Sequence, residues 1–164
     1  MARVEVEKMR LMFGRNNAAI GLLIRFFDIC PFQHVAYRFG EYVYESVGSR
    51  YKGRRGRRKG VIKTHIDDFK KRYKGWTERF VYLPAKLALE TVEARLKALV
   101  DRKADYDFAS VIGSLWIVQL FRIKLGHKLD FNCSELGNEV TGIFTHGVVT
   151  VASWYNISRP MTEY

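Results

Sequence analysis

The hydrophobic pattern of this chain changes its period at Ala85, and this change restricts the possible folds more than any other feature. Before Ala85, apolar and aromatic residues form short runs that end at Gly, Pro or Asp, which is typical of strands. After Ala85, apolar residues recur at helical spacings with charged residues between them: Leu87, Leu89, Val92, Leu96 and Leu99. Strands and helices in separate parts of a chain predict an α+β fold, with an antiparallel sheet packed against helices.

The sequence predicts five strands before the change of period and one near the end of the chain. The five are residues 18–26, 33–39, 42–47, 61–66 and 78–83, and the last is 148–154. A short helix is expected after the strand at 61–66, with Asp67 or Asp68 as its cap. Beyond the helix that begins near Ala85, we expect helices at 108–125 and from residue 133 to about residue 144.

The length of 164 residues and the hydrophobic content of 48% suit one domain with a substantial core. We assign residues 1–17 to an N-terminal extension and residues 18–164 to the domain. Segment 108–123 carries few charges but is shorter than the roughly 20 residues that a membrane-spanning helix needs, so we expect a buried helix there. The first residues lack the basic start and apolar core of a secretory signal, which favours a cytoplasmic protein or one packaged in a virion.

The formal net charge of +11 is concentrated in a segment that we expect to be a flexible basic loop at residues 49–60. Two glycines interrupt its seven cationic residues, which are Arg50, Lys52, Arg54, Arg55, Arg57, Arg58 and Lys59. Such a cluster can be a solvated loop, or it can bind an anionic partner. Nucleic acid, an anionic polymer and a membrane surface would satisfy the charge equally well.

Cys133 is a candidate nucleophile because it lies in or near the first turn of a predicted helix. A cysteine attacks as the thiolate, and the free amides and dipole of a helix N-terminus favour negative charge. The alternative is that Cys133 is a small buried apolar residue. The only other cysteine is Cys30, and two cysteines without zinc-ligand spacing predict reduced thiols, no metal site and no cofactor.

His34 is the histidine best placed to act as the base for Cys133. If the hairpin turns through Gly40 and Glu41, residues whose numbers sum to 81 face each other, so Ala36 opposes Glu45. His34 and Glu45 are then diagonal neighbours on one face, and the small Ala36 leaves room between them. A carboxylate there could orient the imidazole and complete a nucleophile, base and orienting residue. A three-residue turn would place Glu45 on the opposite face.

Four segments, taken in order, resemble a known family. They are GLLIRFFDICPFQHVAYRFGEYVYESVG, VIKTHIDDF, ADYDF and DFNCSEL. Together they resemble the circularly permuted papain-like hydrolases of the NlpC type, with the lecithin-retinol acyltransferase group as more distant relatives, over roughly residues 18–160. The resemblance implies a permuted papain-like fold in which the histidine precedes the cysteine.

The resemblance also implies a role for each residue of the pair and for the acid beside it. Cys133 would be the nucleophile, His34 the general base and acid, and Glu45 the residue that orients His34. The acyltransferase group has a histidine at the position of Glu45, so the chain resembles the hydrolases more closely. Cys30 stands where the family often has a small serine-like residue, and no catalytic role is assigned to it.

The implied function is a cysteine hydrolase that cleaves an amide or peptide bond through a thioester, with bacterial cell-wall peptidoglycan as the first substrate class to consider. One alternative is acyl transfer to or from a lipid, or thioester cleavage, with the same three residues. Another is a non-enzymatic assembly module, for example in a phage particle, in which the basic loop holds an anionic partner and other virion components are its partners.

Overall fold

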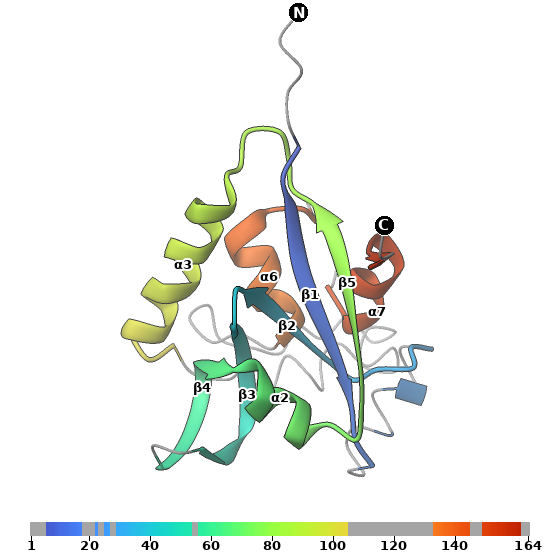
Figure 1. The fold of residues 1–164 in the computed structure, drawn as a ribbon, viewed down its shortest axis with the longest axis vertical. Helices are drawn as coiled ribbons and strands as arrows, with labels where there is room; N and C mark the ends of the chain where they lie inside the picture. Colours follow the sequence, from blue (N-terminus) through green and yellow to red (C-terminus); the bar gives the residue numbers. More distant parts are fainter. Residues whose placement is uncertain are drawn as a thin grey trace, which may run out of the picture.

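A six-stranded sheet lies at the centre of the computed structural model of this chain (Figure 1). The structure describes residues 6–17, 22, 25–26, 29–53, 56–104, 133–144 and 149–161, without the side chains of 49–59. Every strand pairing is antiparallel, and the order across the sheet is β4-β3-β2-β1-β5-β6. The strands are β1 (Lys8–Arg15), β2 (His34–Phe39), β3 (Tyr42–Gly53), β4 (Gly56–His65), β5 (Gly75–Tyr82) and β6 (Arg159–Pro160).

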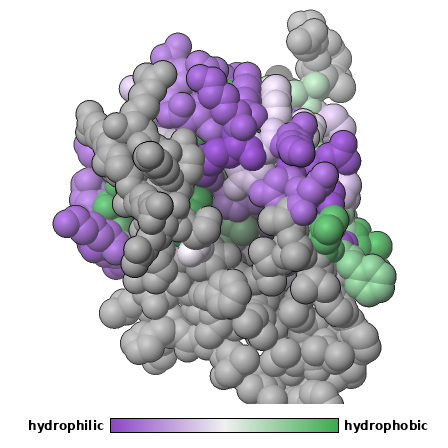
Figure 2. Space-filling view, turned by 90° about the horizontal axis from the view of Figure 1, so that it is seen from below, coloured by the Kyte–Doolittle hydropathy of each residue, from purple (hydrophilic) through white to green (hydrophobic). Residues whose placement is uncertain are grey.

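Helices pack on both faces of this sheet, which confirms the α+β class. Figure 1 shows α2 in front of the sheet and α6 and α7 behind it. The helices are α2 (Ile66–Arg72), α3 (Leu89–Asp101), α6 (Cys133–Thr141) and α7 (Val151–Ile157). On the described surface seen from below, hydrophilic residues predominate and hydrophobic areas are smaller (Figure 2).

Strand β1 is an inner strand that pairs with β2 on one side and β5 on the other. The sequence pattern assigns residues 1–17 to an extension, but residues 8–15 belong to the sheet. The alternation that marks a strand is short in this sequence, because Met12 is buried on the second face and Leu11, Met12 and Phe13 form a continuous apolar run. Leu11 and Phe13 are fully buried on the face that carries the larger core, whereas Lys8 and Arg10 are exposed on the other face.

The strand predicted at residues 18–26 is wrong at the positions that the structure describes. Leu22, Arg25 and Phe26 are helical, and Leu22 and Phe26 are 48% and 76% exposed. A short apolar run has no period of its own, so its sequence does not distinguish a strand from a helix.

The predicted hairpin of β2 and β3 is confirmed, including its register. Tyr37 faces Tyr44 and Phe39 faces Tyr42, and the turn between the strands uses Gly40 with a positive φ of 57°. Strand β3 then continues to Gly53 and pairs with β4. Residues 49–53 and 56–60 are therefore strand arms rather than the predicted loop, and residues 51–53 pair with residues 56–58 beyond an irregularity between Val47 and Tyr51. Residues 54–55 lie outside the described part.

Most of the other predicted elements are present with shifted ends. Strand β5 and helix α3 are confirmed, and α6 begins at Cys133. The short helix α2 is also confirmed, but its cap is His65, whose side chain accepts a hydrogen bond from the Asp67 backbone N–H at 3.3 Å. The helix predicted at 108–125 lies outside the described residues.

The last predicted strand, at 148–154, is wrong, because this part of the chain contains helix α7. Thr150 caps the helix in a reciprocal capping box with Ser153, in which each side chain bonds the backbone N–H of the other. This cap starts a helical turn in a segment whose apolar residues would suit a strand equally well.

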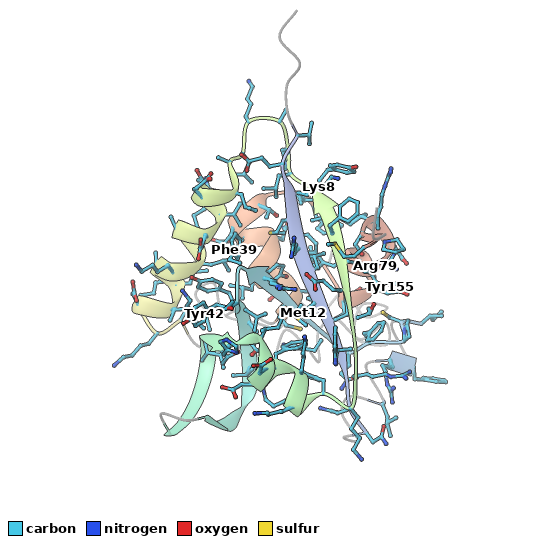
Figure 3. All side chains as sticks on the ribbon, viewed as in Figure 1. Lys8, Met12, Phe39, Tyr42, Arg79 and Tyr155 are labelled. Atoms are coloured by element: carbon cyan, nitrogen blue, oxygen red, sulfur yellow. The ribbon has the colours of Figure 1, made fainter. Side chains whose placement is uncertain are left out.

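The two faces of the sheet carry separate cores. The larger core packs Leu11, Phe13 and Tyr37 against α3, α6 and α7, with Trp154 fully buried among them. The smaller core lies under α2 and contains Met12, Ala36, Val43, Ile66 and Phe69. Met12 marks the middle of this second face in Figure 3.

Candidate active site

Cys133 is the first residue of α6 and is buried, with 6% of its surface exposed. The start of α6 is held against the sheet by Tyr37, whose Oη donates a hydrogen bond to the Cys133 carbonyl oxygen at 2.8 Å. The indole N–H of Trp154, whose ring contacts that of Tyr37, donates to the Ser134 carbonyl at 2.8 Å. These contacts fix the first turn of α6, and with it the direction of the Cys133 side chain.

Gly137 is what allows α6 to approach β2 so closely. A Cβ atom at this position would lie 2.2 Å from the Tyr37 Oη atom, well inside van der Waals contact. Any side chain would displace Tyr37 and break its bond to Cys133. The cysteine is therefore positioned by a contact one helical turn away from it.

His34, the first residue of β2, contacts both other members of the predicted triad. Its Nε2 atom lies 2.9 Å from Oε2 of Glu45. The Cys133 side chain raises the pKa of His34 through charge and hydrogen bonding, so the two side chains lie close together. Because Nε2 is engaged by the carboxylate, Nδ1 is the ring nitrogen left for the thiol. The structure thus brings Cys133, His34 and Glu45 together from α6, β2 and β3.

Glu45 is fully buried, and both of its carboxylate oxygens have partners. Oε2 faces His34, while Oε1 accepts a hydrogen bond from the Thr64 hydroxyl at 3.0 Å and forms an ion pair with Arg72. A buried carboxylate with paired oxygens keeps its charge and its orientation. Arg72 and Thr64 therefore hold the acid that holds His34.

The charges of this cluster support one another. Burial alone lowers the pKa of His34, but the negative charges of Cys133 and Glu45, together with its hydrogen bonds to them, raise it to about 9. Burial raises the pKa of Glu45, but His34 and Arg72 outweigh this and hold it below its usual range. At neutral pH the arrangement is thus an imidazolium between a carboxylate and the sulfur of Cys133.

Two aromatic rings hold the plane of the imidazole. Tyr73 stacks on the His34 ring with centroids 5.2 Å apart and an interplanar angle of 13°, and Phe69 lies 6.2 Å away. Gly14 on β1 faces His34 and leaves space for the Tyr73 ring, because a Cβ at Gly14 would lie 2.6 Å from Tyr73. The His34 imidazole therefore has a fixed orientation between Glu45 and Cys133.

Gln33 adds a polar group beside the cluster. Its side-chain amide is buried, and within the described part of the chain neither its nitrogen nor its oxygen has a hydrogen-bond partner. Buried amides without partners are rare, since each costs about 1–3 kcal/mol. The residue directly before His34 thus retains an unused donor and an unused acceptor.

The other cysteine and histidines, to which no catalytic role is assigned, lie outside the cluster or outside the described residues. Cys30 is buried in the larger core, and His65 serves as the cap of α2. His127 and His146 lie outside the described residues, as do Arg54 and Arg55 of the predicted anion-binding segment. The backbones of Arg50, Lys52, Arg57, Arg58 and Lys59 belong to β3 and β4, and their binding of an anion stays a prediction.

Sequence reasoning missed the residues that support the triad. Arg72 is one of three consecutive basic residues in α2, and nothing in the sequence distinguishes it from Lys70 and Lys71. Thr64 could have been identified only from the register of β3 with β4. In that register Thr64 faces Val43, which lies two residues before Glu45 on the same face of the sheet. Both contacts depend on packing between separate elements.

Comparison with protein-family models, with curated proteins and with solved structures finds no match for this chain. Among the described residues, no group of three or more His, Cys, Asp or Glu side chains could hold a metal ion. None of the helices in the described ranges is long and apolar enough to span a bilayer.

Proposed function

We propose that this protein is a cysteine hydrolase that cleaves an amide or peptide bond, with Cys133 as nucleophile, His34 as general acid and base, and Glu45 as the positioning residue. The observation that carries the proposal is the contact of one buried imidazole with both the Cys133 side chain and the Glu45 carboxylate. A nucleophile, a base and a group that orients the base form the minimal arrangement for acyl transfer through a covalent intermediate.

The proposed resting state is a thiolate beside an imidazolium, and the raised pKa of His34 supports the imidazolium. In the first step, the Cys133 sulfur forms a bond to the substrate carbonyl carbon, and the carbonyl oxygen becomes an oxyanion. Backbone N–H groups in the first turn of a helix favour negative charge, so the start of α6 is suited to stabilise that oxyanion. His34 then gives its proton to the leaving amine, and the carbon–nitrogen bond breaks to leave a thioester.

In the second step, neutral His34 takes a proton from water, and the resulting hydroxide attacks the thioester carbonyl. The carbon–sulfur bond breaks, the carboxylic acid leaves and the thiolate is restored beside the imidazolium. Glu45 keeps the Nε2–H bond throughout, so that Nδ1 stays directed at the sulfur. Arg72 neutralises Glu45, and this keeps the carboxylate from removing the imidazole proton.

The order His34, Glu45, Cys133 along the chain supports a permuted papain-like fold, in which the cysteine helix follows the sheet strands. Peptide bonds of bacterial cell-wall material are the first substrate class that we propose. The resemblance of the segments around His34 and Cys133 to NlpC-type hydrolases suggests this class.

The decisive experiment labels the thiols with an iodoacetamide probe from pH 5 to pH 9. The matched variants are Cys133→Ala, Cys30→Ala and His34→Ala, since Cys30 is a buried thiol outside the cluster. An ordinary thiol with a pKa of about 8.5 is about 0.3% ionised at pH 6. We expect Cys133 to react at pH 6 at least tenfold faster than such a thiol, and His34→Ala to remove this excess.

A second readout tests the reaction itself. Incubation with cell-wall stem peptides should give a transient mass increase on Cys133, the thioester, and release of peptide fragments with a new carboxyl end. If Cys133 reacts as an ordinary thiol and His34→Ala leaves its rate unchanged, the catalytic assignment is wrong. If labelling is fast but no peptide is cleaved, the cysteine is activated and the substrate class is wrong.

A further inference from the structure

The sheet face that carries His34 and Glu45 also carries a second feature, at its opposite end. Helix α2 covers the middle of this face, and beyond it β1, β5 and β6 leave a groove of about 700 Å³. Its lining consists of Lys8, Arg10, Phe80, Tyr82, Arg159, Pro160 and Met161. Figure 3 shows Lys8 near the end of β1, beside β5 and away from α2.

The strand register explains why these side chains gather in one place. Phe80 faces Arg10 on β1 and Arg159 on β6, so one row across three strands presents a cation, an aromatic ring and a cation. Two residues further along, Tyr82 faces Lys8. Residues that face one another across antiparallel strands project on the same side, so the groove has an aromatic floor with cations around it.

The cations lie directly over the rings. The Lys8 ammonium is 4.9 Å from the Phe80 centroid and 5.6 Å from the Tyr82 centroid, and the Arg159 guanidinium is 5.5 Å from the Tyr82 centroid. Tyr82 nevertheless remains 41% exposed. None of the residues that line the groove is acidic, and of its three cations only Arg10 has a carboxylate partner within the described residues, Glu78 at 3.9 Å.

This combination selects a ligand with negative charges and flat faces. Cations alone would accept any polyanion, but exposed aromatic side chains beside a cationic track are suited to stacking of unpaired bases. Lys8 and Arg10 are two residues apart on one strand, so their charges repeat at about 7 Å along the groove, which an extended backbone can follow. Duplex nucleic acid hides its base faces, and acidic polypeptides have none.

We propose that the groove of β1, β5 and β6 binds single-stranded nucleic acid, with Tyr82 and Phe80 as stacking surfaces and Lys8, Arg10 and Arg159 as phosphate partners. On binding, Lys8 and Arg159 move from the ring faces to the phosphates, and bases take their places on the rings. This site is separate from the cysteine cluster and from the basic segment at 49–60. It does not depend on the proposed hydrolase activity.

The experiment measures fluorescence anisotropy of a labelled 12-nucleotide oligothymidylate with the full chain at several salt concentrations. Tyr82→Leu removes the ring but keeps an apolar side chain, and it should weaken oligothymidylate binding about tenfold. Tyr82→Phe should restore the affinity. Lys8→Gln and Arg159→Gln should each weaken binding and reduce its salt dependence.

The matched control is Tyr42→Leu. Tyr42 is 45% exposed and also lies under a lysine, with the Lys63 ammonium 4.4 Å from its ring centroid, but it is on β3, outside the groove. Heparin, a polyanion without bases, separates stacking from charge. We expect Tyr42→Leu to leave oligothymidylate binding within twofold of wild type, and Tyr82→Leu to leave heparin binding unchanged. Cys133→Ala should bind like the wild type.

Three results would overturn the proposal. The first is equal loss of oligothymidylate binding in Tyr82→Leu and Tyr42→Leu. The second is binding that Tyr82→Leu and Lys8→Gln do not change, which would assign the affinity to charge elsewhere, such as the segment at 49–60. The third is no oligothymidylate binding together with Tyr82-dependent binding of polyglutamate or of anionic vesicles, which would assign the groove to another class of partner.

Discussion

Replacing Glu45 by Gln removes one charge from the centre of the cluster while keeping the size and shape of the side chain. The single side-chain oxygen of the glutamine should face Arg72 and Thr64, because both are hydrogen-bond donors. The new amide then faces Nε2 of His34 and donates to it. His34 must therefore lose the proton on Nε2 and carry its single proton on Nδ1, the nitrogen that faces Cys133.

Two magnitudes follow from this rearrangement. Breaking a buried ion pair on one side costs about 3–5 kcal/mol, and because the amide oxygen still accepts from Arg72 and Thr64 we expect a loss of about 3 kcal/mol in the free energy of unfolding. A neutral His34 with the wrong tautomer cannot take the Cys133 proton through Nδ1. Inverting the tautomer of a catalytic histidine costs about 10⁴-fold in turnover.

The stability assay is urea unfolding at pH 7 under reducing conditions, followed by tryptophan fluorescence, for which Trp154 is a fully buried probe. The chemical assay is the rate of Cys133 alkylation at pH 6 in a Cys30→Ala background. The control variant is Glu78→Gln, which loses an ion pair with Arg38, at 2.5 Å, but is not part of the His34 and Cys133 cluster. It should keep the wild-type alkylation rate.

Glu45→Gln should lower both the free energy of unfolding and the Cys133 alkylation rate. Glu78→Gln should change the free energy of unfolding alone. Wild-type stability and wild-type alkylation in Glu45→Gln would refute the view that the carboxylate holds His34 in its charged form. A stability loss with an unchanged alkylation rate would limit Glu45 to a structural partner of Arg72. Equal slowing of alkylation in Glu78→Gln would show that the effect is general loss of stability.

Three further predictions concern single groups in or beside the cluster. Gln33→Leu should raise the free energy of unfolding by about 1 kcal/mol in urea, because an apolar group of similar size replaces a buried amide without partners. If that amide contacts substrate, the same variant should also lower the turnover of peptide cleavage. Gly137→Ala should lower the free energy of unfolding by about 2 kcal/mol in the same assay, because its Cβ displaces Tyr37 and the start of α6. This loss exceeds the gain from the better helix propensity of alanine. An unchanged stability and an unchanged Cys133 alkylation rate would contradict the close contact. The His34 ring should titrate near pH 9 by NMR. Because this pKa is raised from 6.5, the contribution of the charged ring to stability is complete below pH 6.5 and is lost as the pH rises through 9. A ring that titrates near 6.5 would refute the ion pair.

The sequence by itself determined those parts of the fold that depend on neighbours along the chain. The register of β2 with β3 follows from the turn at Gly40 and the period of two in a strand, so the pairing of His34 with Glu45 could be predicted. The start of α6 at Cys133 and the buried face of α3 also follow from local patterns. These features need only short-range steric and hydrophobic rules.

The tertiary structure decided everything that depends on which distant segments become neighbours. The central position of β1 and the role of Arg72 as partner of Glu45 cannot be read from residues close by in the chain. The same applies to the groove of β1, β5 and β6. Single residues carry no signal of their cross-strand partners, because strand order is set by the burial of the whole sheet rather than by any one segment.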